Sequence, residues 1–242
     1  MKVFALLLAW MGAGTVLGGD ENLLARWTFA NGSLKSDVGA FEFQEGNGGF
    51  VETGKSSVTL VGPKVLSCTA ISSASQPELP GSVTVWARVK FDELPQSGEL
   101  GVMGLQSGVA SGGWPALILS LLYRSMADDP VNAGLGFLAR PQGVEELGVG
   151  RDLFQQVVPG EFVNVAIVFN GAANTAAMWV SRSGVWAESR REHAALLENF
   201  DALLIGKLIT PGADTAVTFD EVRVYGAALN PSGLASITAV ED

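Results

Sequence analysis

Residues 216–237, AVTFDEVRVYGAALNPSGLASI, combine a long strand pattern with the start of a helix. Side chains of a strand point alternately to the two faces of its sheet. This alternation predicts one face made of Val217, Phe219, Glu221, Arg223 and Tyr225, and an opposite face made of Thr218, Asp220, Val222 and Val224. Gly226 ends the pattern, Asn230 is a favourable helix N-cap, and Pro231 suits the first helical position. The sequence therefore predicts a strand, a turn and a short helix here.

The charged side chains of this strand also matter for function. Alternation places the carboxylates of Asp220 and Glu221 on opposite faces, where they could not act as a catalytic pair. Glu221 and Arg223 share a face, and two interpretations of this pair stay open. They form or join an ion-pair network that holds the strand to its neighbours, or they contact a ligand.

Short strand patterns bounded by Gly, Pro or Ser continue along the chain. The clearest is 81–91, GSVTVWARVKF, with a predicted core face of Val83, Val85, Ala87, Val89 and Phe91 and an opposite face of Thr84, Trp86, Arg88 and Lys90. Other predicted strands are 23–29, 40–43, 49–51, 57–61, 65–71, 100–106, 116–123, 135–139, 144–149, 152–158, 161–170, 176–181 and 203–207. Residues 188–199 are predicted to form a short helix or a loop. This spacing favours a β-sandwich over a βαβ pattern.

Five of these motifs, in this order, resemble the LamG-like jelly-roll domains of the concanavalin A-like lectin/glucanase superfamily. The matching segments are LLARWTF at 23–29, TVWARV at 84–89, EFVNVAIVFN at 161–170, LLIG at 203–206 and the stretch from Phe219 to Pro231. The resemblance implies an all-β, antiparallel two-sheet sandwich of jelly-roll type with a short C-terminal helix, as one domain over residues 19–242. Two positions depart from the family pattern. Ala30 replaces the usual acidic residue, which leaves no ion ligand there, and Phe162 replaces the usual Trp.

Residues 1–18 have the features of a secretory signal peptide. Lys2 supplies the positive start, an apolar run follows, and Val16 and Gly18 occupy the small-residue positions before a predicted cut at Gly19. A retained membrane anchor is the alternative. The first interpretation predicts a secreted, periplasmic or cell-surface protein with no membrane insertion after signal cleavage.

Composition narrows the classes of partner. The 242 residues include 30 glycines, which suits many strands joined by turns. The formal net charge of −10 disfavours nucleic acid and anionic membranes as partners. The acidic side chains serve solubility or bind calcium. Cys68 is the single cysteine, so it makes no internal disulfide; it is either buried and inert or forms a covalent dimer, and its strand context favours burial.

Three tryptophans are the candidate ligand-binding residues. Trp114 and Trp186 lie in predicted loops, where an indole either stacks on a sugar ring or covers one end of the core. Trp86 either packs under a covering segment or lines an exposed sheet surface. Calcium is a possible cofactor, with Asp37, Asp128 and Asp129 as candidate oxygen ligands in loops; for the pair Asp128 and Asp129 an ordinary turn is the alternative.

The absence of one motif decides the prediction on catalysis. Retaining glycoside hydrolases of the superfamily carry Glu-x-Asp-x-x-Glu on one strand, and no acidic cluster of this chain has that spacing. The sequence therefore predicts no enzyme. The leading hypothesis is an exported, non-catalytic module that binds extracellular or cell-surface carbohydrate. A structural or protein-interaction module without a sugar site is the second hypothesis, and an atypical glycoside hydrolase is the third.

Overall fold

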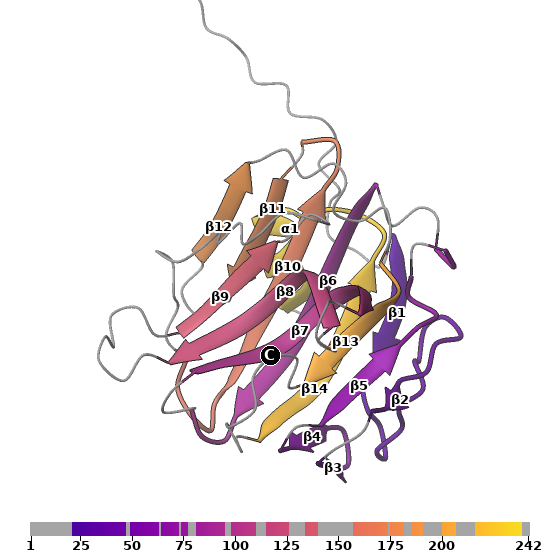
Figure 1. The fold of residues 1–242 in the computed structure, drawn as a ribbon, viewed down its shortest axis with the longest axis vertical. Helices are drawn as coiled ribbons and strands as arrows, with labels where there is room; N and C mark the ends of the chain where they lie inside the picture. Colours follow the sequence, from indigo (N-terminus) through magenta and orange to yellow (C-terminus); the bar gives the residue numbers. More distant parts are fainter. Residues whose placement is uncertain are drawn as a thin grey trace, which may run out of the picture.

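The computed structural model describes most of the chain. The described residues are 21–46, 49–62, 64–72, 74–76, 81–94, 98–109, 115–125, 134–139, 157–173, 175–181, 185–190, 200–206 and 216–238. They form two antiparallel sheets that lie one over the other and one short helix (Figure 1). The predicted two-sheet β-sandwich with a C-terminal helix is therefore confirmed. The predicted signal peptide, residues 1–18, lies outside the described residues.

The larger sheet has eight described strands. Its order is β12 (Val185–Arg190), β11 (Thr175–Val180), β10 (Phe162–Asn170), β6 (Ser82–Phe91), β14 (Val217–Tyr225), β4 (Val58–Val61) and β3 (Phe50–Thr53), and β1 (Leu23–Trp27) also pairs with β14. Strand β14 is therefore central, as its sequence pattern indicates.

The smaller sheet has six described strands. Its order is β2 (Gln44–Glu45), β5 (Val65–Cys68), β13 (Ala202–Gly206), β7 (Gly98–Val109), β8 (Pro115–Ser125) and β9 (Gly134–Ala139). The core between the two sheets receives apolar side chains from both of them. They include the predicted inner face of β6, namely Val83, Val85, Ala87, Val89 and Phe91, all with 0% exposure.

Helix α1 (Pro231–Thr238) covers part of the outer face of the larger sheet. It begins as predicted, because the backbone N–H of Gly233 donates to Oδ1 of Asn230 at 2.8 Å. Leu234 and Ile237 pack in a second apolar cluster with residues from β6, β10, β11 and β14, among them Trp86, Val168, Trp179 and Tyr225. No described helix is long and apolar enough to cross a membrane.

A β-bulge corrects the predicted faces of β14. Phe219 pairs with Val89 of β6, but Glu221 pairs with the very next residue, Arg88, so Asp220 is an extra residue in the strand. The extra residue reverses the alternation beyond it. The side chains that β14 buries in the main core are those of Val217, Phe219, Val222 and Val224. Asp220 and Glu221 consequently share the outer face, and the prediction that they lie on opposite faces is wrong.

Several predictions of local structure are wrong or fall outside the described residues. Val185–Arg190 form the strand β12, so the predicted helix or loop is wrong where it overlaps that strand. Residues 40–43 form only an isolated bridge at Glu42. The predicted strand at 144–149 and most of 152–158 lie outside the described residues, and Val157 and Val158 are not in a strand.

The burial of Cys68 is confirmed by its 0% exposure, and this burial raises the pKa of its thiol. A thiol of this kind is poorly reactive, because the thiolate is the nucleophile and burial disfavours it.

Candidate ligand-binding site

A break in strand pairing opens a hollow beside the bulge of β14. Along one edge, β14 pairs with β4 through Val217–Phe219 and with β1 from Val222 to Tyr225. Neither β1 nor β4 pairs with Asp220 or Glu221. The hollow has a volume of about 280 Å³, and we call it the notch. Its lining residues are Arg26, Thr28, Ser56, Arg88, Asp220 and Glu221.

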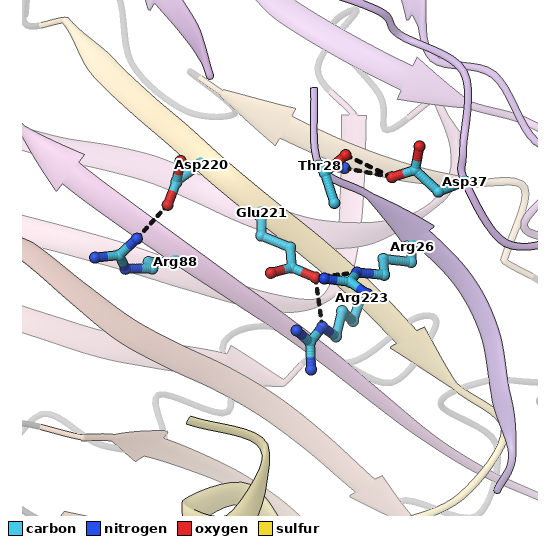
Figure 2. Close-up of polar contacts among 7 residues, drawn as sticks. All are labelled: Arg26, Thr28, Asp37, Arg88, Asp220, Glu221 and Arg223. Atoms are coloured by element: carbon cyan, nitrogen blue, oxygen red, sulfur yellow. Dashed lines mark hydrogen bonds and ion pairs between the residues drawn. The ribbon is translucent and has the colours of Figure 1, made fainter. Parts of the chain in front are cut away.

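Ion pairs hold the charged side chains of the notch. Arg26 of β1 donates from Nε to Oε1 of Glu221 at 2.5 Å, and Arg223 donates from Nε to the same oxygen at 2.6 Å. Arg88 of β6 donates from Nη1 to Oδ2 of Asp220. Figure 2 shows Glu221 between the two arginines, with the Arg88–Asp220 pair beside them. The ion-pair network predicted for Glu221 and Arg223 is therefore confirmed, and it joins β14 to β1.

The two pairs differ in burial. Glu221 and Arg223 are only 6% and 7% exposed, whereas the side chains of Arg88 and Asp220 are 35% and 21% exposed. Desolvation alone would lower the pKa of the Arg223 guanidinium, but interactions with Glu221, and after it with Tyr225, outweigh desolvation and raise that pKa. Arg223 and Glu221 are therefore a structural pair, while Arg88 and Asp220 remain open to solvent.

The segment after β1 forms one wall of the notch. Asp37 accepts hydrogen bonds at Oδ2 from the backbone N–H of Thr28 at 3.0 Å and from its Oγ1 at 2.6 Å (Figure 2). Asn31 donates its N–H to the carbonyl oxygen of Lys55 at 2.7 Å, next to Ser56. These bonds fix Thr28 and Ser56 on the two sides of the break.

The turn of this wall has an unusual backbone. Phe29 has a φ of 51° although its ring is buried, and Asn31 and Gly32 follow with φ of 55° and 72°. A side chain at Gly32 would place its Cβ 2.6 Å from Cβ of Thr53, so the turn requires glycine there. Asn adopts this backbone conformation readily in turns, so Phe29 is the unusual residue of this tight turn.

An exposed aromatic ring lies next to the notch. Phe162, at the start of β10, is 37% exposed and is one of two large apolar side chains exposed among the described residues. The guanidinium carbon of Arg88 lies 4.7 Å from its ring centroid, and Nζ of Lys90 lies 5.7 Å from it. Arg88 thus contacts both the ring and Asp220, and it connects the aromatic surface to the notch.

The three candidate tryptophans have different outcomes in the structure. Trp86 has 0% exposure beneath α1, and the guanidinium of Arg223 lies 4.9 Å from its ring centroid. This burial corrects the suggestion that Trp86 lines an exposed surface, because α1 covers that part of the sheet. Trp114 lies outside the described residues. Trp186 is in β12, where its backbone pairs with Trp179, and it is not in a loop.

The candidate calcium ligands are not brought together in the described part of the chain. Asp37 is exposed and uses one carboxylate oxygen for Thr28, while Asp128 and Asp129 lie outside the described residues. Within the described ranges, no three His, Cys, Asp or Glu side chains gather closely enough to hold a metal ion. Calcium binding therefore stays a prediction.

Five residues that line the notch are not binding candidates in the sequence analysis, namely Arg26, Thr28, Ser56, Arg88 and Asp220. A signal for the bulge was nevertheless present in β14. Its apolar inner residues follow the spacing 217, 219, 222 and 224, and the step of three coincides with two consecutive acidic residues. Such a step marks an inserted residue and puts both acidic side chains on one face. No comparable signal indicates that β1 and β4 leave a break there.

No family model matches the chain, and no curated protein matches it. Similar solved structures show the fold. A Trypanosoma rangeli sialidase in complex with a difluorinated sugar acid is 17% identical with a TM-score of 0.65, and the match covers 89% of this chain and 32% of the sialidase. The binding domain of botulinum neurotoxin DC in complex with rat synaptotagmin II is 7% identical with a TM-score of 0.59, over 90% of this chain and 52% of that one. The chain thus spans about a third of the length of the sialidase and about half of the length of the toxin domain.

These neighbours correct the expectation about catalysis. The absence of one glycosidase motif predicts no enzyme, but several of the matched structures are sialidases, which are enzymes. The expectation is therefore contradicted, since the fold occurs within enzyme chains. At 17% identity over a third of the sialidase, the likeness concerns the fold and assigns no catalytic residue here.

Proposed function

We propose that the chain is an exported β-sandwich module that binds carbohydrate outside the cell or at its surface. The notch is the observation that carries this proposal. It combines guanidinium groups, carboxylates and two hydroxyl groups in one open hollow, with an exposed aromatic ring beside it. Sugars present many hydroxyl groups, which both donate and accept hydrogen bonds, and an apolar ring face that packs on aromatic side chains.

The structural neighbours support a binding role without naming a ligand. A Trypanosoma rangeli sialidase has been seen in complex with sialic acid, and the neurotoxin domain is a binding domain in complex with synaptotagmin II. The first favours carbohydrate as the ligand, and the second supports an extracellular protein as the second candidate. The notch favours carbohydrate, because Phe162 and Val158 are the only exposed large apolar side chains of the described residues, and a protein interface is expected to have a larger apolar centre.

A glycan array tests the proposal with the purified chain. We expect binding to a defined subset of immobilised oligosaccharides, with a dissociation constant that isothermal titration confirms in solution. Variants Trp114→Ala and Trp186→Ala show whether these tryptophans contribute as well. A chain that binds no oligosaccharide but captures an extracellular protein would replace this proposal with the second candidate.

Calcium binding is tested separately by thermal melting, first in chelator and then in millimolar calcium. A ligand that binds only the folded state, at a hundred times its dissociation constant, adds about 2.7 kcal/mol of stability. We expect a melting temperature several degrees higher in calcium if the loops around Asp37, Asp128 and Asp129 bind it. An unchanged melting temperature would remove calcium from the proposal and leave the notch unaffected.

A further inference from the structure

We infer that the notch is the sugar-binding site and that it selects a neutral ring with neighbouring hydroxyl groups. This inference rests on the proposed function and deepens it, because it names the site and the class of ligand. Three properties of the notch carry it: the polar atoms that its own contacts leave unused, the balance of its charges, and its size and surroundings.

The internal contacts of the notch leave donors and an acceptor for a ligand. The side chain of Arg26 forms polar contacts with other described residues only through Nε, so its two terminal amino groups remain available, and it is 39% exposed. Asp220 uses Oδ2 for Arg88 and retains Oδ1. Ser56 adds an exposed hydroxyl. A pair of neighbouring hydroxyl groups can donate to a carboxylate oxygen and accept from a guanidinium at the same time.

The charges of the lining side chains favour a neutral ligand. Arg26 and Arg88 contribute two positive charges, and Asp220 and Glu221 contribute two negative charges. An anionic group entering the notch would meet both carboxylates, and a cation would meet both guanidinium groups. Arg88 pairs with Asp220, and Arg26 shares one oxygen of Glu221 with the buried Arg223, so a neutral polar ligand gains hydrogen bonds without displacing an ion pair.

The ion pairs also hold the donors in place before a ligand arrives. Glu221 is buried and holds Arg26, while Asp220 holds Arg88, which packs over the ring of Phe162. Side chains that are already ordered lose less conformational entropy on binding. The notch is therefore a preorganised site despite its exposure.

The size of the notch fits one ring rather than a long chain. Its volume of about 280 Å³ lies just below the range of about 300–1,000 Å³ typical of small-molecule pockets. Phe162 lies on the far side of Arg88 and is 37% exposed. A second ring of an oligosaccharide could pack there, which adds affinity for a ligand longer than a monosaccharide.

Two variants of the purified chain test the site. Asp220→Asn removes the carboxylate acceptor at nearly constant shape, and Arg26→Lys keeps the charge but loses the forked donors. Each is expected to weaken the tightest-binding neutral oligosaccharide of the array by about tenfold or more, as for the loss of a hydrogen bond to a charged group. The matched control is Glu45→Gln, which breaks the ion pair with Lys64 in the smaller sheet, away from the notch and from Phe162, and should leave binding unchanged. Melting curves verify that each variant is folded.

A panel of neutral oligosaccharides, each with its sulfated or sialylated counterpart, tests the class of ligand. We expect the neutral member of each pair to bind more tightly, with a dissociation constant nearly independent of salt concentration. Preference for the anionic members, lost in high salt, would overturn the neutral class.

Different results would overturn the assignment of the notch and the proposed carbohydrate binding. Unchanged oligosaccharide binding by folded Asp220→Asn and Arg26→Lys proteins would overturn the assignment of the notch while the proposed function stands. A wild-type chain that binds no member of the panel would overturn both.

Discussion

The outer face of the eight-stranded sheet has two halves of opposite chemistry, although β6, β10 and β14 contribute to both. One half lies under α1 and buries Trp86, Val168 and Tyr225. The other half contains the notch, with charged side chains that stay partly exposed. A covered sheet face stabilises the fold through its buried apolar area but is inaccessible to ligands. An open polar face is accessible to ligands but adds little buried apolar area. The comparison indicates that the covered half stabilises the fold, while the half that contains the proposed site leaves its polar groups accessible.

Arg223 marks the boundary between the two halves. Its guanidinium lies 4.9 Å from the ring centroid of Trp86 on the covered side, and its Nε donates to Glu221 on the open side. The bulge at Asp220 lies just beyond it. A single residue inserted in β14 therefore coincides with the start of the charged half.

The largest loss of stability is expected at the covered half. Trp86→Ala would remove a fully buried indole and leave a cavity under α1, at a cost of about 3–5 kcal/mol. Urea unfolding followed by circular dichroism measures this change. Phe162→Ala on the open half serves as the comparison and should cost about 1 kcal/mol or less, because its ring is 37% exposed. Equal losses would show that the two halves do not differ in their contribution to stability.

Glu221→Gln examines the boundary and should have the second-largest effect. Removing the carboxylate charge takes the charge of Glu221 away from the buried Arg223, and the amide keeps only part of the hydrogen bonding. We expect a loss of about 2 kcal/mol in the free energy of unfolding. The control Glu52→Gln changes an exposed side chain of β3 and should shift stability by less than about 0.5 kcal/mol. If the two variants behave alike, the buried network has no structural role.

Asn230→Ala tests whether the cap of α1 maintains the covered half. The variant loses the hydrogen bond from the N–H of Gly233 to Oδ1 and should cost about 1 kcal/mol. Asn230→Ser retains a capping oxygen and should recover most of that loss. Thermal melting compares the three proteins, and an Asn230→Ala protein as stable as wild type would contradict a contribution of this cap to stability.

Asp220→Asn should have the smallest effect on stability. The Arg88–Asp220 pair is partly exposed, and surface ion pairs contribute about 0–1 kcal/mol. The same variant is expected to weaken sugar binding strongly, which would separate binding from stability at one residue. A loss above about 2 kcal/mol in urea unfolding would show instead that the open half carries stability as well.

Sequence patterns predict most of the fold, because the alternation of apolar and polar residues in a strand is visible within a few neighbouring positions. The inner face of β6 was correct in full, since its five apolar residues alternate without interruption. In β14 the same rule failed after Phe219, because one extra residue reversed the faces of every residue that follows. β12 was missed because its pattern, VWAESR, ends in polar residues and has no continuous apolar face.

The site was less predictable than the fold. The binding candidates inferred from the sequence were aromatic, and the one whose side chain is described, Trp86, is buried. The notch depends on residues from β1, β6, β14 and the segment before β4, which are up to 195 positions apart. Nothing local in Arg26 or Ser56 reveals that β1 and β4 leave a break beside the bulge.

By itself the sequence determined the two-sheet sandwich, the N-capped terminal helix and the burial of Cys68, because alternation, turn residues and capping act over a few neighbouring residues. Only the tertiary structure decided which side chains surround the notch and which tryptophan α1 covers. Those outcomes depend on strand pairing between distant segments and on the register of one bulge, and a shift of one residue there exchanges the two faces of a strand.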